Sequence, residues 1–155
     1  MPVLPLVEIA ALLPARGALI GLDLGTKTIG VAISDLTRQI ASPLETIARR
    51  KFADDAQRLI HLAKREKAGL IVLGLPLNMN GSEGPRAQST RAFARNLARQ
   101  IDIPIVFWDE RLSTAAVERM LIDADQSRAK RAAVIDKLAA AYILQSALDS
   151  LNPAP

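Results

Sequence analysis

The chain has 155 residues, of which half are hydrophobic and 3% aromatic, so it is long enough for one domain with a mainly aliphatic core. It contains no cysteine, which excludes disulfides, thiolate nucleophiles and cysteine metal sites. The net charge of +4 is compatible with a polyanionic partner such as nucleic acid, although many basic proteins have no such partner.

The first 17 residues are apolar in part, but three prolines and Glu8 interrupt them. A secretory signal needs a basic start and an unbroken apolar stretch, and neither is present. No apolar run approaches the roughly 20 residues that span a membrane. We therefore expect a cytoplasmic protein without membrane association, in which residues 1–17 form an N-terminal extension and residues 18–151 a single domain.

Two apolar runs of strand length, residues 18–24 and 29–34, are joined by a short Gly-Thr-Lys-Thr connection. This pattern predicts an antiparallel hairpin. Asp23 is the only polar residue of the first run, and on a strand it shares a face with Leu19 and Gly21. A carboxylate at that position is costly to desolvate unless a cation, a hydrogen-bond donor or open water meets it.

The remaining elements alternate between helix and strand. Periodic apolar residues predict helices over residues 52–67, 86–100, 113–122 and 133–151, and apolar runs predict strands over residues 39–47, 69–75 and 103–108. A hairpin followed by alternating strands and helices indicates a mixed α/β sheet with helices on both faces, as in the ribonuclease H-like fold. A flavodoxin-like fold should not begin with a two-strand hairpin.

Three acids, Asp23, Glu110 and Asp136, occupy positions that favour a shared site. Asp109 and Glu110 directly follow a predicted strand, where ligands bind in largely parallel sheets. Asp136 lies on the apolar face of the last predicted helix. Taken alone, Asp136 has an ordinary interpretation as a helix cap, and Asp23 as an acceptor of turn hydrogen bonds. Together with Glu110, they supply three oxygen ligands from separate elements, which suits Mg²⁺ or Mn²⁺, whereas zinc is disfavoured.

Four sequence blocks permit a more specific comparison. They are GLDLGTK from Gly21, GLP from Gly74 with Asn78 and GS at 81–82, DERLST from Asp109, and DK from Asp136 with AA at 139–140 and ILQ at 143–145. In this order, and over roughly residues 19–148, the blocks resemble the YqgF family of pre-16S rRNA nucleases, also called Holliday junction resolvase-like proteins.

The resemblance implies a ribonuclease H-like fold and a hydrolase that removes the 5′ extension of immature 16S ribosomal RNA. The acids of the family match Asp23, Glu110 and Asp136, which would be both catalytic and metal-binding residues. The implied chemistry is phosphodiester hydrolysis assisted by Mg²⁺ or Mn²⁺. Many nucleases of this fold carry four acids, and Asp109 is the nearest further ligand.

Cationic and small polar residues near these blocks are candidates for contacts with nucleic acid. A cation beside the proposed metals would meet phosphate oxygens, and a basic segment ahead of the last helix suits the RNA backbone. Ordinary interpretations compete, because Arg111 can pair with Asp109 or Glu110 and residues 78–86 can form a plain exposed loop. The candidates are Lys27, Asn78, Ser82, Arg86, Arg111, Arg128, Lys130 and Arg131.

Two alternatives stay open. A Holliday junction resolvase acting on DNA would need a symmetric dimer, whereas the sequence shows no obvious dimer seam and we expect a monomer or a weak homodimer. The other alternative is a non-catalytic RNA-binding or ribosome-assembly module that keeps the acids for stability. The main hypothesis has precursor 16S rRNA as its partner, either free or within a pre-ribosomal particle.

Overall fold

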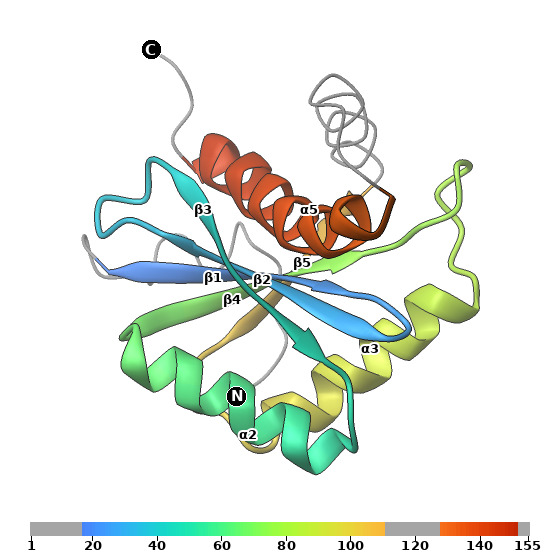
Figure 1. The fold of residues 1–155 in the computed structure, drawn as a ribbon, viewed down its shortest axis with the longest axis horizontal. Coiled ribbons are helices and arrows are strands. Elements are labelled where there is room, and N and C mark those ends of the chain that lie inside the picture. Colours follow the sequence, from blue (N-terminus) through green and yellow to red (C-terminus); the bar gives the residue numbers. More distant parts are fainter. Residues whose placement is uncertain (1–16, 111–127, 152–155) are drawn as a thin grey trace.

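The computed structural model describes residues 17–110 and 128–151, and for residues 128–136 it describes the backbone alone. These residues form a five-stranded sheet with helices on both faces (Figure 1), which confirms the predicted mixed α/β fold. The elements in chain order are β1 (Ala18–Leu24), β2 (Thr28–Ser34), β3 (Ala41–Ala48), α2 (Phe52–Arg65), β4 (Ala68–Leu75), α3 (Pro85–Ala98), β5 (Ile105–Asp109) and α5 (Arg128–Leu151).

The strand order across the sheet is β3-β2-β1-β4-β5. β1 and β2 pair antiparallel as the predicted hairpin, and β3 pairs antiparallel with β2. β4 lies parallel to β1, and β5 lies parallel to β4. β3 is therefore an edge strand, a position that tolerates Pro43 because an edge strand pairs on one side only. The carboxyl ends of β1, β4 and β5 meet at one edge of the fold.

The central strands are buried on both faces, which explains their continuous apolar sequences. Leu22 and Leu73 belong to the core beneath α2 and α3, whereas Leu19, Leu70 and Val72 belong to the core beneath α5. In Figure 1, α2 and α3 cover one face of the sheet and α5 crosses the other. Alternation along β1 thus places Asp23 on the α5 face.

Gly21 allows α5 to lie directly on β1. A Cβ at Gly21 would be 2.7 Å from Cβ of Leu144 and 2.9 Å from the carbonyl oxygen of Ala140. Further along the helix, the Gln145 side chain accepts a hydrogen bond from the backbone N–H of Ala41 at the beginning of β3 (2.9 Å). α5 therefore runs from the carboxyl end of β1 toward its amino end, and the backbone of Asp136 lies one turn before Ala140 in the direction of Asp23.

The last helix begins earlier than predicted. α5 starts at Arg128, so the segment with Arg128, Lys130 and Arg131 is the first turn of the helix rather than a basic stretch ahead of it. Arginine, lysine and alanine are strong helix formers, and nothing between residues 128 and 133 interrupts the helix. The helix predicted over residues 113–122 lies outside the described residues. None of the described helices combines the length and hydropathy that a bilayer-spanning helix requires.

Candidate active site

The structure brings Asp23 and Glu110 together at the carboxyl ends of the strands. Asp23 is the penultimate residue of β1, and Glu110 follows directly after the last residue of β5. Both residues are half-buried, and their carboxyl groups are hydrogen-bonded to each other. We call Asp23 and Glu110 the carboxyl pair. Two acids that lie 87 positions apart in the chain are thus neighbours in the fold.

Gly74 makes this meeting possible, because β4 lies between the strands that lead to the two acids. A Cβ at Gly74 would be 2.8 Å from Cγ and 2.9 Å from Oε1 of Glu110, and 2.6 Å from Cδ1 of Ile143. Such distances are shorter than carbon atoms tolerate without displacement. Glu110 therefore extends across β4 through space that only glycine leaves open.

The carboxyl pair is electrostatically unfavourable without a cation. Burial, followed by the hydrogen bond to Asp23 and the charge of Asp23, raises the pKa of Glu110 to about 8, and the charge of Asp109 contributes in the same direction. At neutral pH Glu110 consequently keeps its proton and donates the hydrogen bond to Asp23. A site in which adjacent carboxylates resist ionisation, and which offers hard oxygen donors, fits a divalent cation.

Arg86 lies beside the carboxyl pair. It occupies the first turn of α3, its Nη2 contacts the carbonyl oxygen of Leu24 at 3.5 Å, and its positive charge opposes the rise in the pKa of Glu110. The N-cap of α3 is Gly84, which provides no side-chain cap, and the first turn contains no acid. A helix N-terminus with these properties favours an anion. The side of the site that holds Arg86 is therefore suited to a phosphate group.

Asn78 and Ser82 bond to each other rather than to the carboxyl pair. The Asn78 Nδ2 donates to Oγ of Ser82 (3.0 Å), and the Asn78 backbone N–H donates to the Ser82 carbonyl oxygen (2.9 Å). The Ser82 hydroxyl in turn donates to Oδ1 of Asn80 (2.6 Å). These bonds close the loop between β4 and α3 on itself and leave both side chains exposed.

Lys27 is exposed at the tip of the β1–β2 turn, which a hydrogen bond from the Gly25 N–H to the Thr28 carbonyl oxygen closes (2.8 Å). Arg49, the residue directly after β3, was not singled out by the sequence, and it holds this turn. Its Nη1 donates to the Gly25 carbonyl oxygen (2.6 Å), and its backbone N–H donates to the Lys27 carbonyl oxygen (2.9 Å). A run of three cations at positions 49–51, between a predicted strand and a predicted helix, was the available signal.

For the other predicted site residues, the structure does not describe the side chains. Arg111 lies outside the described residues, and Asp136, Arg128, Lys130 and Arg131 are described by their α5 backbone alone. Within the side chains that are described, no group of three or more acids or histidines is arranged for a metal ion. The three-acid set of Asp23, Glu110 and Asp136 therefore stays a prediction, of which the structure brings the first two together.

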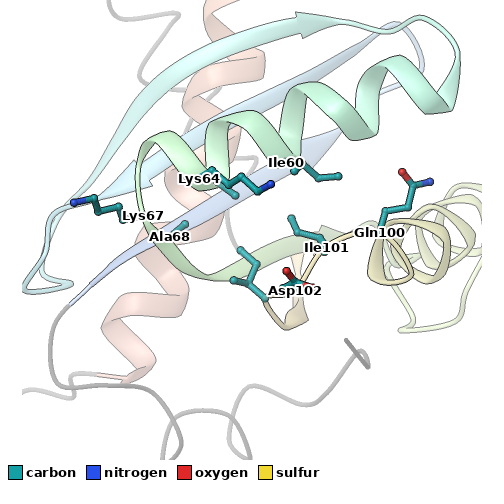
Figure 2. Close-up of a pocket in the computed structure, with 9 residues that line it drawn as sticks. Ile60, Lys64, Lys67, Ala68, Gln100, Ile101 and Asp102 are labelled. Atoms are coloured by element: carbon teal, nitrogen blue, oxygen red, sulfur yellow. The ribbon is translucent and has the colours of Figure 1, made fainter.

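A separate pocket of about 290 Å³ lies at the opposite end of the sheet, where α2 and α3 end and β4 begins (Figure 2). Ile60 and Ile101 contribute apolar walls, and Lys64, Lys67 and Asp102 contribute charge. None of the predicted site residues lines this pocket. It is therefore distinct from the candidate active site.

The sheet order, with an antiparallel hairpin followed by parallel strands and helices on both faces, defines a ribonuclease H-like α/β fold. In agreement, the structure is similar to Thermus thermophilus RuvC in complex with a Holliday junction substrate, with a TM-score of 0.56 and 12% sequence identity over 90% of this chain and 98% of that chain. At this identity the similarity establishes the fold alone.

The family follows from sequence comparison. Residues 17–150 match the RuvX family, which is described as Holliday junction resolvase, and the chain belongs to this family. It is 67% identical over 150 residues to a Rhodopseudomonas palustris protein named "Putative pre-16S rRNA nuclease", covering 97% of this chain and 94% of that protein. A protein of the same name from Nitrobacter winogradskyi is 67% identical over 149 residues, covering 96% and 91%. These matches confirm the resemblance indicated by the four sequence blocks.

Proposed function

We propose that this chain is a divalent-metal-dependent nuclease that hydrolyses a phosphodiester bond near the 5′ end of precursor 16S rRNA. The observation that carries the proposal is the carboxyl pair, in which two acids at the carboxyl ends of different strands are held in contact at the edge where ligands bind in such sheets. The names of the close relatives support ribosomal RNA as the substrate.

Asp23, Glu110 and Asp136 would hold Mg²⁺ or Mn²⁺. When bound, the metal would supply activation of water and stabilisation of the charge that develops on the phosphate oxygens. The protein residues prepare the site for it. Glu110 would release to solvent the proton that it holds in the metal-free protein, and both members of the carboxyl pair would then serve as anionic oxygen donors. Gly74 keeps the path of Glu110 open.

Arg86 and the N-terminus of α3 would orient the scissile phosphate. The guanidinium lies close enough to Glu110 to oppose the rise in the pKa of Glu110, so a phosphate at the site would meet the positive charge of Arg86 in addition to that of the bound cation. Lys27, on the turn that follows β1, would contact a neighbouring phosphate of the same strand. Contacts of this kind position the RNA backbone without reading its sequence.

A DNA junction is the second candidate substrate, since the family is described as Holliday junction resolvase and the fold matches a resolvase. The experiment that separates the two substrates is cleavage of a 16S precursor fragment and of a four-way DNA junction, each with Mn²⁺, with Mg²⁺ and with EDTA. We expect metal-dependent cutting of the RNA. Metal-dependent cutting of the junction alone would replace the RNA assignment, and equal cutting in EDTA would overturn the metal-dependent mechanism.

A further inference from the structure

A second group of cations lies at the same end of the fold as the carboxyl pair. We infer that the β1–β2 turn and the β3–α2 loop together bind the phosphodiester backbone of the strand that leads away from the cleavage point. The contact groups are Lys27, Arg50 and Lys51, which we call the turn surface. The inference rests on the proposed nuclease function. It adds Arg50 and Lys51 to the residues proposed to contact the substrate.

Strand pairing places the loop beside the turn. Thr28 of β2 is opposite Ala48 of β3, so residues 49–51 leave the sheet next to the residues that connect β1 and β2. Two hydrogen bonds fasten the segments together, from the backbone N–H of Arg49 to the Lys27 carbonyl oxygen and from Nη1 of Arg49 to the Gly25 carbonyl oxygen. Gly25 is two residues beyond Asp23, so the β1–β2 turn begins at the end of β1 that carries Asp23.

Arg49 holds the β1–β2 turn in place and does not itself belong to the turn surface. Its guanidinium lies 5.9 Å from the ring centroid of Phe93, and this ring packs edge-to-face against Phe52 with centroids 5.4 Å apart. The Arg49 side chain is thereby committed to the β1–β2 turn and to the aromatic pair, an arrangement in which a cation over a ring adds stability. Arg49 is therefore a positioning residue, and the residues that follow it are left to face solvent.

The loop backbone is also fixed on its other side. The Arg50 N–H donates to Oδ1 of Asp55 (3.0 Å), and Asp55 is 3% exposed. The Lys51 carbonyl oxygen accepts hydrogen bonds from the N–H groups of Asp54 (3.0 Å) and Asp55 (3.1 Å) at the beginning of α2. A backbone held in this way presents its side chains without a large loss of loop entropy on binding.

The side chains of the turn surface are available for a ligand. Lys27, Arg50 and Lys51 are exposed, and none of the ion pairs found among the described residues involves them. By contrast, Arg58 on the next turns of α2 is paired with Glu45 (2.6 Å). Asp54 is an exposed acid close to the loop, which leaves the turn surface with a net positive charge. Fixed cations next to a proposed phosphodiester cleavage site fit a nucleic-acid backbone.

The test compares two double variants that remove the same charge. Arg50→Gln with Lys51→Gln alters the turn surface, and Lys64→Gln with Lys67→Gln alters the pocket at the opposite end of the sheet (Figure 2). Binding of the 16S precursor fragment and of the four-way DNA junction is measured by fluorescence anisotropy in EDTA, at several salt concentrations. Thermal unfolding shows that each variant is folded, and the single variants Lys51→Gln and Lys67→Gln repeat the comparison with a smaller change.

We expect the turn-surface variant to bind about tenfold or more weakly, with a slope of log affinity against log salt that is smaller by about 1.4 for a single strand. The Lys64 and Lys67 variant should bind within about twofold of the parent protein. The substrate on which the loss is seen identifies the strand that the turn surface holds. Unchanged binding by the turn-surface variant, or equal losses in both variants, would overturn the inference while leaving metal-dependent cleavage intact. Absence of binding by the parent protein to either substrate would instead contradict the proposed function.

Discussion

Replacing Asp23 by asparagine is expected to reduce metal-dependent cleavage on the order of 10³-fold while the protein stays folded. Asparagine keeps the shape of the side chain and can donate to Glu110, but it removes the charge that Asp23 would contribute to holding the cation. Cleavage is measured under single-turnover conditions with the precursor fragment. Asp102→Asn, an exposed acid at the opposite end of the sheet, is the matched control and should cleave at the parental rate.

The same substitution should make the metal-free protein less sensitive to alkaline pH. The folded-state pKa of Glu110 is raised from 4.5 to about 8, so the folded protein binds more protons than the unfolded chain between these values, and stability falls as pH rises through that window. Part of the rise in the pKa of Glu110 comes from Asp23, so Asp23→Asn should lower this pKa and narrow the pH range over which stability falls. Thermal unfolding in EDTA from pH 6 to 9 measures the difference. A folded Asp23→Asn protein that cleaves at the parental rate would refute the catalytic role of Asp23.

The second large effect is expected for Gly74→Ala. The new Cβ would lie 2.6 Å from Cδ1 of Ile143 and 2.8 Å from Cγ of Glu110, so both side chains must move. We expect a loss of about 1–3 kcal/mol in the free energy of unfolding and, because Glu110 is displaced, about 100-fold slower cleavage. Thermal unfolding and single-turnover cleavage, the latter well below the melting temperature, measure the two effects separately.

Gly69→Ala is the matched control for Gly74→Ala. Gly69 lies on the same strand, and a Cβ there would have no atom within 4 Å. The control should change stability by less than about 0.5 kcal/mol and leave cleavage unchanged. A Gly74→Ala protein that loses stability but cleaves at the parental rate would show that Gly74 serves packing against α5 and has no part in positioning Glu110.

Much of the fold could be predicted because hydrophobic periodicity reports which faces are buried. The apolar runs of β1 and β4 and the stripe on α2 have unambiguous periods, and a hairpin before alternating strands and helices leaves few topologies. The beginning of α5 was placed too late, since a basic, helix-forming segment carries little apolar periodicity. Composition at positions 128–132 is typical of a helix and of a basic linker alike.

The sequence predicts the acids of the candidate site but not the residues that position them. Asp23 is conspicuous within an apolar strand, and Glu110 follows a strand end, so each is visible from local sequence. That their carboxyl groups touch depends on the register of three strands. The same register places Gly74 next to Glu110. The sequence shows Gly74 only as the first residue of the GLP block and does not indicate that it makes room for Glu110. Arg49 holds a turn more than 20 residues earlier in the chain, which no local pattern reveals.

The central claim is that the carboxyl pair holds a divalent cation, and Mn²⁺ titration by calorimetry in buffers of different ionisation enthalpy tests it most directly. Because the pKa of Glu110 is about 8, the carboxyl group is about nine-tenths protonated at pH 7 and must release this proton to bind metal. We predict release of nearly one proton per bound ion at pH 7, decreasing toward none at pH 9, with binding at least tenfold weaker in Asp23→Asn. Binding that is as tight in Asp23→Asn as in the parent protein, or proton release that is the same at both pH values, would contradict the claim.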